Sequence, residues 1–398
     1  MLVLVLNAGS SSLKYQLINA KTGDAVASGL VERIGIDGIL KHEVGENKKL
    51  TFEIDMPTHK EAIELVLKTL TIYETKVIDS VDEIKAVGHR VVHGGEYFKE
   101  STIIDNDVIK KIEELIPLAP LHNPANILGM KICQKLMPKT PNVAVFDTAF
   151  HQTMPEENYL YAVPHEDYTE HHLRKYGFHG TSHFYVSQEA IKLLGNKKNS
   201  RIIVCHLGNG SSVCAVKDGK SISTSMGLTP LEGLVMGTRS GDIDAGVIPY
   251  LMEKKNMDTH QIIDYLNKKS GILGVSGISS DLREVIKASN DGDQRAIVTI
   301  KLLCNRIKRY LCSYAGGLGG VDAICFTAGI GENSDLIREK VCNGLEFMGI
   351  ELDKEKNKIR SSENREISKS TSKTKIYVIP TNEELVIAQD TYNLVKGK

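Results

Sequence analysis

The sequence predicts an α/β protein in which one domain plan occurs twice, with a cleft between the two copies. Residues 202–216 read as two apolar runs around a polar G-N-G-S-S turn, which is typical of a β-hairpin. Residues 4–16 repeat this order of strand, small polar turn and strand about half a chain earlier. Each half then continues with helices that alternate with strands, and no low-complexity linker separates the halves. The cleft between such copies is a common place for a ligand.

The first half is expected to begin with three consecutive antiparallel strands, because its apolar residues alternate or run together over 2–7, 13–18 and 25–33. Residues 41–54 are more polar and either complete this sheet or form a loop. Thr58 and Glu61 have the spacing of a capping box and start a helix. The further elements are a buried strand over 84–92, a helix over 105–116, a helix with Pro124 at its first position, and a strand over 142–146 that ends at Asp147.

The second half is expected to repeat this outline after a His-rich connection at 158–183. A helix over 182–194 leads into the hairpin of 202–216, and residues 221–246 form a loop whose length suggests a function. The remaining elements are helices at 244–255, 259–269, 281–289 and 293–315 (the last ending at Gly316-Gly317), a strand at 322–327, a turn at 328–334 with a helix after it, a charged and solvated excursion at 353–373, a strand at 376–379, and a C-terminal helix capped by Thr381-Asn382.

Composition excludes several classes of function. The 398 residues are enough for two domains, and the formal net charge of −1 provides no field that would attract nucleic acid or an acidic membrane. No apolar run approaches the length of a membrane span, and the apolar N-terminus lacks the features of a signal peptide. The seven cysteines are odd in number and show no C-x-x-C spacing, which favours a cytoplasmic location over a disulfide framework or a zinc site.

Three turns of small residues follow strands and are candidates for binding phosphate groups. They lie at 7–12, 208–212 and 328–334. None has the G-x-x-x-x-G-K-[ST] pattern of a P-loop, and none is a G-x-G-x-x-G turn that opens a helix in a βαβ unit. One such turn alone is more often an ordinary flexible hairpin tip. Three of them, together with the duplication, favour a bound polyphosphate, with glycine allowing successive N–H groups to form an anion-binding nest.

Charged residues near these turns are candidates for the chemistry. Arg90 lies at a strand end beside small residues, and Arg239 lies in the loop M-G-T-R-S-G-D, which is otherwise uncharged until Asp242. Most arginines form structural ion pairs or caps, but little else in either loop needs a long cation. Asp147 follows a buried strand, and His179 is one of 13 histidines among which spacing alone does not choose. These residues therefore remain candidates whose roles the pattern does not separate.

Oxygen-bearing side chains at the ends of elements suggest a metal site. Asn7, Glu383 and Asp147 are hard ligands of the kind that suit Mg²⁺, which keeps waters and relies on substrate phosphates. No cysteine cluster supports zinc.

Eight motifs together resemble the acetate kinase family, and the match runs from residue 3 to about residue 390 without a departure at a motif position. The motifs are N-A-G-S-S-S-L-K at 7–14, G-H-R-V-V-H-G-G at 88–95, F-D-T-A-F-H at 146–151, Y-G-F-H-G-T-S-H at 176–183, H-L-G-N-G-S-S at 206–212, G-T-R-S-G-D-I-D at 237–244, F-T-A-G-I-G-E-N at 326–333 and P-T-N-E-E at 380–384.

The resemblance implies the superfold of acetate and sugar kinases, Hsp70 and actin, in which two ribonuclease H-like domains flank an interdomain cleft. It implies an N-terminal domain over 1–150 plus 383–398 on the acetate and magnesium side, and a domain over 151–382 that binds nucleotide and forms a homodimer. The implied reaction is reversible, direct in-line transfer of the γ-phosphoryl group of ATP to acetate, which gives acetyl phosphate and ADP. Mg²⁺ is the implied metal, with Mn²⁺ as a substitute.

Motif positions that match the family carry implied roles. For the metal they are Asn7 and Glu383, and for the acetate methyl group Val92, Leu121, Phe178 and Pro230. For the reaction they are Arg90 on the carboxylate, Asp147 as the active-site acid, and His179 and Arg239 on the transition state. For nucleotide phosphates they are Lys14, His206, Leu207, Gly208, Asn209 and Gly210, and for the nucleoside Asp281, Leu282, Arg283, Gly329, Ile330, Gly331, Glu332 and Asn333.

The chemistry of acetate adds one reservation to these roles. A carboxylate with a pKa near 4 to 5 is already ionised at neutral pH, so its oxygen needs no general base (compare about 4.3 for Glu). The difficulty is to bring an anion up to a polyanion, which calls for cations and hydrogen-bond donors around the transferred group. We therefore expect Asp147 mainly to orient an arginine or a metal-bound water.

Alternative functions share much of this pattern. A propionate-preferring kinase is the nearest, because one methylene in an apolar pocket separates two acids by only about 1–3 kcal/mol. A non-metabolic actin-like ATPase, a sugar kinase and a nucleotide sensor are the others. The set of Arg90, Asp147, His179 and Arg239 argues against a sensor. The sequence leaves the donor, ATP or pyrophosphate, and the preferred direction open.

Overall fold

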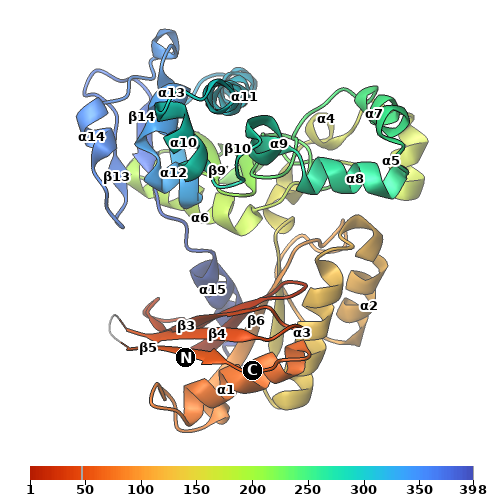
Figure 1. Ribbon diagram of the computed structural model, residues 1–398. Helices are drawn as coiled ribbons and strands as arrows, with labels where there is room; N and C mark the ends of the chain where they lie inside the picture. The colour runs from red at the N-terminus through yellow and green to blue at the C-terminus, as the bar shows by residue number, and fades with distance from the viewer. Residues whose placement is uncertain (46–47, 398) are drawn as a thin grey trace. The chain divides into compact units, whose positions relative to one another are not determined.

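The computed structural model describes residues 1–45 and 48–397. The chain divides into two compact units: the first unit is Met1–Phe150 with Asn382–Lys398, and the second unit is His151–Thr381. Each unit contains one mixed β-sheet that is covered by helices (Figure 1). Among the described residues, no helix is both long and apolar enough to cross a membrane.

The first unit is built on an eight-stranded sheet with the order β5-β4-β3-β2-β1-β6-β8-β7. Side chains of β1 alternate between two faces: Leu4 and Leu6 pack in a core with α1 and α3, and Val3 and Val5 pack in a core with α15. Figure 1 shows α1 and α3 on one side of this sheet and α15 on the other. The strands are β1 Leu2–Ala8, β2 Leu13–Asn19, β3 Ala25–Glu32, β4 Ile39–Val44, β5 Lys48–Glu53, β6 Ile84–Val91, β7 Thr102–Ile103 and β8 Asn142–Phe146. The helices are α1 His59–Thr71, α2 Asn106–Glu114, α3 Asn123–Leu136 and α15 Glu383–Val395, with short 3₁₀ helices at Val81–Glu83, Ile116–Leu118 and Ala149–Thr153 (the last runs into the second unit).

The second unit is built on a six-stranded sheet with the order β11-β10-β9-β12-β14-β13. Ile203, Cys205 and Leu207 of β9 pack in a core with α10, α11 and α13, and α6 contacts β9 and β12. The strands are β9 Arg201–Leu207, β10 Ser211–Lys217, β11 Lys220–Thr224, β12 Ala323–Thr327, β13 Arg365–Glu366 and β14 Lys375–Val378. The helices are α4 Glu156–Tyr159, α5 His165–His171, α6 Gly180–Leu193, α7 Val247–Lys255, α8 Thr259–Lys268, α9 Gly271–Ser276, α10 Leu282–Asn290, α11 Gln294–Leu318, α12 Ala328–Asn333, α13 Asp335–Cys342 and α14 Lys354–Lys358, with a 3₁₀ helix at Glu346–Met348.

The two sheets share one strand order, which confirms the predicted duplication. The order β3-β2-β1-β6-β8 in the first unit corresponds to β11-β10-β9-β12-β14 in the second. In each, the central strand pairs antiparallel with the strand that follows it and parallel with the next strand of the sheet (β1 with β2 and β6, β9 with β10 and β12). The two predicted hairpins are therefore β1–β2 and β9–β10. The parallel pairs direct the carboxyl ends of their strands to one edge, where ligands commonly bind.

The structure corrects one predicted helix end. Helix α11 continues through Gly316 and Gly317 and ends at Leu318, with Gly319 as a left-handed cap at φ 68°. Tyr314, Ala315 and Leu318 are buried in the core of the second unit, so packing holds the last turn although glycine weakens it. The predicted end at the glycine pair was wrong for this reason.

Other segments are more ordered than the sequence pattern indicated. Residues 41–54 lie mostly in β4 and β5 and complete the sheet, although Glu46 and Asn47 fall outside the described residues. The His-rich connection holds α4 and α5, and the loop expected at 221–246 begins with β11. The predicted turn at 328–334 is the helix α12, which follows β12 without a break. The excursion at 353–373 contains α14, β13 and the fully buried Ile367, so it is part of the fold.

Candidate functional site

Five polar side chains of the first unit surround a small cavity of about 80 Å³. They are Asn7 at the end of β1, Lys14 of β2, Arg90 of β6, and Glu383 and Glu384 of α15. The Asn382 side chain caps α15 by accepting a hydrogen bond from the Leu385 N–H (3.1 Å), which places both glutamates in the first turn. Negative side chains are favourable there. Glu384 forms an ion pair with Lys14. Asn7 and Glu383, the metal residues that the resemblance implies, thus share one cavity with the predicted carboxylate-binding arginine. Asp147, the third oxygen ligand that the sequence suggested, does not line it.

Arg90 and Asp147 form a bidentate ion pair behind this cavity. Their strands, β6 and β8, are parallel neighbours. The Arg90 Nε donates to Asp147 Oδ1 at 2.9 Å, and Nη2 donates to Oδ2 at 2.6 Å. The side chains are 22% and 1% exposed. A guanidinium has five N–H donors, and this pair uses two of them, so both N–H groups of Nη1 remain outside the pair.

Burial and pairing act in opposite directions on this couple. Burial raises the pKa of the Asp147 carboxyl, and Arg90 opposes that rise. Burial lowers the pKa of Arg90, but Asp147 outweighs burial and leaves that pKa above its usual value. The geometry favours the ionised carboxylate, because a protonated oxygen would be a donor facing an N–H donor. We therefore describe Arg90 and Asp147 as a buried salt bridge.

His179 of the second unit is held in an unusual backbone conformation by a set of hydrogen bonds. It precedes α6 with φ 57°, in the left-handed region that non-glycine residues rarely adopt, and such outliers cluster at functional sites. Its Nδ1 lies 2.9 Å from the Ser212 hydroxyl, which also lies 2.7 Å from Nε2 of His183. Burial, with its histidine neighbours, keeps the pKa of His183 well below its ordinary value. A neutral imidazole and a hydroxyl thus fix the ring of His179.

His206 supports this ring from one side. The rings of His179 and His206 stack with their centroids 4.1 Å apart, and Nδ1 of His206 lies 2.7 Å from the Ser182 hydroxyl. His206 is 7% exposed, and it does not line the large pocket described below.

Arg239 approaches the same point from the loop after β11. A Cβ atom added to Gly210 would lie 3.5 Å from His179 Nε2 and 3.7 Å from Arg239 Nη1, so both groups reach the hairpin tip. Nη1 donates to the Pro230 carbonyl (3.1 Å) and lies 3.8 Å from the sulfur of Met236. Among the described residues, no carboxylate forms an ion pair with Arg239, and burial lowers the pKa of its guanidinium. The site therefore contains a partly buried cation without a counter-charge.

The hairpin tip does not have the predicted nest geometry. Neither Gly208 nor Gly210 adopts left-handed angles, and the Gly208 N–H donates within the turn to the Gly210 carbonyl (3.1 Å). A nest needs alternating right- and left-handed residues. A Cβ atom at Gly210 would lie at ordinary van der Waals distance from His179 and Arg239, so a small side chain there would stand beside both groups without a clash.

Gly237 joins the Arg239 loop to this tip, and replacing it with alanine tests the junction. Its N–H donates to the Asn209 carbonyl at 2.9 Å, and an added Cβ would lie 1.7 Å from Asn209 Oδ1. Gly237→Ala is expected to displace the Asn209 side chain and to raise the KM for nucleotide about 10- to 100-fold, the value of one hydrogen bond to a charged group. The matched control is Gly246→Ala, whose Cβ would have its nearest contact at 3.4 Å. Equal KM values for both variants would contradict the expectation.

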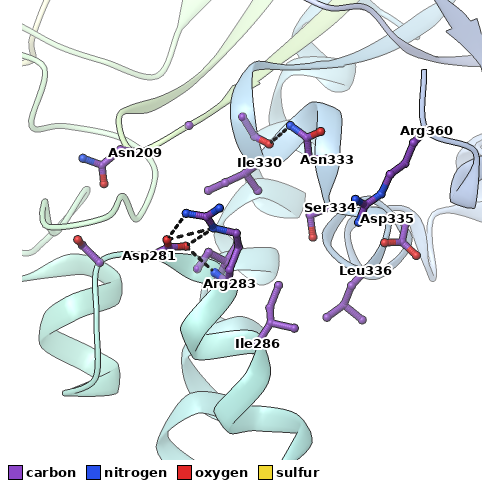
Figure 2. Close-up of a pocket in the computed structure, with 14 residues that line it drawn as sticks. Asn209, Asp281, Arg283, Ile286, Ile330, Asn333, Ser334, Asp335, Leu336 and Arg360 are labelled. Atoms are coloured by element: carbon purple, nitrogen blue, oxygen red, sulfur yellow. Dashed lines mark hydrogen bonds and ion pairs between the residues drawn. The ribbon is translucent and has the colours of Figure 1, made fainter. Parts of the chain in front are cut away.

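A pocket of about 820 Å³ lies in the second unit (Figure 2). Its wall includes eight of the residues predicted to bind nucleotide: Gly208, Asn209, Asp281, Leu282, Arg283, Gly329, Ile330 and Asn333. Asp281 caps α10 by accepting from the Arg283 N–H (2.9 Å) and pairs with the Arg283 guanidinium (2.6 Å). A volume of this size lies within the range of pockets that hold a drug-sized ligand.

The other predicted nucleotide residues do not line this pocket. Leu207 is 1% exposed and belongs to the core. Gly331 is buried, and a Cβ atom added to it would lie 3.3 Å from the Phe326 carbonyl carbon. Glu332 accepts from the Ala328 and Thr381 N–H groups (2.8 and 3.2 Å). The rest are His206, Gly210 and, in the first unit, Lys14. Sequence reasoning missed Ser280, Ile286, Ser334, Asp335, Leu336 and Arg360, which do line it.

The residues predicted to hold a methyl group are divided between the units. Val92 is 7% exposed and Leu121 is 57% exposed in the first unit. Phe178 is 2% exposed in the second unit, where Pro230 holds Arg239 through its carbonyl. Their assembly into one pocket stays a prediction.

Comparison with known proteins identifies the family. The model of the acetokinase family matches residues 2–389. This chain belongs to the acetokinase family. It is similar to the acetate kinases of Treponema denticola (56% identity) and Fusobacterium nucleatum (57%), in each case over 100% of both chains. Among acetokinase-like structures, the acetate kinase of Porphyromonas gingivalis has a TM-score of 0.95 at 49% identity, covering 99% of this chain and 100% of that one. A propionate kinase of Francisella tularensis has a TM-score of 0.93 at 44% identity with the same coverage.

Proposed function

We infer that this chain is an acetate kinase, which reversibly transfers the γ-phosphoryl group of ATP to acetate and forms acetyl phosphate and ADP. Membership of the acetokinase family and similarity to full-length acetate kinases support this inference. The structural observation that carries it is the Arg239 guanidinium, which forms no ion pair within the described part of the chain and meets His179 at a hairpin tip that also borders the large pocket. Cations placed beside a phosphate site are what phosphoryl transfer requires.

The transfer is proposed to be direct and in line. One oxygen of acetate attacks the γ-phosphorus, the bond to the bridging oxygen of ADP breaks, and that oxygen keeps the electron pair. Acetate is already an anion, so no proton needs to be removed. Arg90 binds the carboxylate, and Arg239 and His179 stabilise the charge on the transferred group. Asp147 holds Arg90 in position through the two hydrogen bonds of their salt bridge.

The cavity of the first unit fits a divalent cation. Asn7 and Glu383 contribute oxygen donors, which is the chemistry that Mg²⁺ prefers, and Mn²⁺ takes similar ligands. These two residues would hold the ion, which when bound would neutralise phosphate charge. We further propose a homodimer formed through the second unit and a cytoplasmic location. Among the described residues the seven cysteines are free thiols, which is consistent with a reducing compartment.

The reaction is tested by trapping acetyl phosphate with hydroxylamine. The full-length chain with acetate, MgATP and hydroxylamine is expected to give a hydroxamate, and replacing ATP with pyrophosphate is expected to give none. Phosphate release from ATP that does not depend on a carboxylate would favour an actin-like ATPase instead. Absence of hydroxamate from every carboxylate would refute the proposal.

A propionate-preferring kinase is the second candidate function, because one similar structure is a propionate kinase. Val92, Phe178, Leu121 and Pro230 are proposed to enclose the methyl group. We expect kcat/KM for acetate to exceed that for propionate, by a factor of about 10 to 200, which is the range for one methylene. Steady-state kinetics with acetate, propionate and butyrate measure this factor. A higher kcat/KM for propionate would reassign the substrate and leave the reaction type unchanged.

A further inference from the structure

The segment 353–366 forms part of the wall of the large pocket, although its sequence suggested only a solvated excursion. It contains α14 and β13, and it contributes Arg360 to the pocket lining. Figure 2 shows Arg360 and Asn209 on opposite sides of the pocket, with Arg283 and Ile330 between them. The segment is therefore placed to contact the end of a ligand that is farthest from the hairpin tip.

A buried arginine attaches this segment to the predicted nucleotide-binding helix α12. Arg338 of α13 is 2% exposed. Its Nη1 donates to the carbonyl oxygens of Gly331 (2.8 Å) and Glu332 (2.9 Å), at the end of α12. Its Nε and Nη2 donate to the side-chain and backbone oxygens of Asn357 (2.7 Å each), at the end of α14. Burial lowers the pKa of Arg338 to about 10, so the group remains charged at neutral pH.

Two further hydrogen bonds strengthen this attachment. Arg365 Nη2 donates to the Glu332 carbonyl (3.0 Å), and the Asn357 amide donates to the Asp335 carbonyl (2.9 Å). Buried polar groups with several partners specify one arrangement of the backbone. The position of residue 360 relative to α12 is thus fixed by the fold.

Arg360 itself has no such structural role. Its side chain is exposed, and none of the hydrogen bonds and ion pairs among the described residues involves it. The hairpin tip near Asn209 adjoins His179 and Arg239, so the phosphates belong at that end and the nucleoside at the other. The side chains of Ile286, Ile330 and Leu336 make the wall partly apolar, as a base requires.

We propose that Arg360 binds the base of the nucleotide, with its planar guanidinium against the ring. This inference rests on the proposed function, because it takes the pocket to be the ATP site. The planar, weakly hydrated guanidinium of arginine stacks on aromatic faces, whereas the ammonium of lysine is a compact, strongly hydrated point charge that lacks this planar surface. The segment 353–366 then serves to carry this contact, and Arg338 is the residue that positions it.

The test compares Arg360→Ala, Arg360→Lys and the control Lys358→Ala in the full-length chain. Lys358 is exposed on the same segment, pairs with Glu355 and does not line the pocket. Arg360→Ala is expected to raise the KM for MgATP about 3- to 30-fold, the range from a solvent-exposed to a desolvated cation–π contact, with kcat and the KM for acetate within twofold of the unchanged chain. Arg360→Lys is expected to recover little of the loss, and Lys358→Ala to lose nothing.

Calorimetric titration with adenosine, ADP and ATP identifies the part of the ligand that Arg360 contacts. A base contact predicts that Arg360→Ala weakens all three ligands by the same factor. A loss confined to ADP and ATP would overturn the base contact in favour of a phosphate contact. If Arg360→Ala leaves the KM for MgATP and all three affinities as they are, the base contact is overturned. The proposed function is judged separately, by whether the protein without a substitution forms hydroxamate.

Discussion

Replacement of Arg239 by alanine is expected to lower kcat by a factor of about 10³ to 10⁵, the range that an arginine on the transition state contributes to phosphoryl transfer. The guanidinium is partly buried and has a carbonyl oxygen and a thioether as its partners, without a carboxylate among the described residues. Its charge is therefore available to the phosphoryl group, whose oxygens carry the charge in the transition state. The side chain does not line the large pocket, so affinity for ADP is expected to change little.

The hydroxamate assay measures kcat, and calorimetry measures ADP affinity. Arg239→Lys is expected to retain part of the rate, because it keeps the charge and loses the planar fork. The matched control is Arg309→Ala, which removes an exposed arginine from α11 of the same unit and should leave kcat unchanged. A drop in kcat of less than tenfold for Arg239→Ala would contradict the role, as would a loss of ADP affinity as large as the loss of rate.

Much of the fold followed from local patterns, and the exceptions have physical causes. The capping box of Thr58 and Glu61 begins α1 as predicted, and the alternating residues of 2–7 and 13–18 form β1 and β2. The end of α11 was missed because burial of Tyr314 and Leu318 outweighs the low helix propensity of two glycines. Helix propensity can be estimated from a short stretch of sequence, but the burial of these residues in the core depends on the whole fold.

Many individual residues of the candidate site were predicted from the sequence, but the contacts between them were not. Arg90 and Asp147 were each placed at a strand end, but their salt bridge depends on β6 and β8 being neighbours in the sheet. In the chain these strands are separated by β7, α2, a 3₁₀ helix and α3. Leu207 matches a binding motif, yet the period of two along β9 turns its side chain into the core. Arg360 lies in no motif, and its place in the pocket depends on the contacts of the buried Arg338. Long-range pairing of this kind leaves no trace in a single sequence.

Replacement of Asp147 by asparagine is expected to lower kcat/KM for acetate about 10²- to 10³-fold. Removing one partner of a buried salt bridge costs about 3–5 kcal/mol, and the lower part of this range applies because Arg90 is 22% exposed. The asparagine amide would present N–H groups to a guanidinium that has only donors, so Arg90 loses one of its two hydrogen bonds and turns away. Because Arg90 is the proposed carboxylate ligand, the loss should appear in the kinetic constants for acetate. The KM for ATP should stay within about twofold of the value for the protein without a substitution.

A double-mutant cycle decides whether Asp147 acts through Arg90 or transfers a proton by itself. If Asp147 only positions Arg90, then adding Asp147→Asn to Arg90→Ala should cost little more activity. The coupling energy between the two substitutions should then nearly equal the whole effect of Asp147→Asn alone. If Asp147 has a chemical role of its own, the two losses should add. We expect strong coupling, because both carboxylate oxygens are engaged by the guanidinium and acetate has no proton to give up. Additive losses, with the double variant folded by circular dichroism, would contradict the positioning role and restore Asp147 as an acid or base.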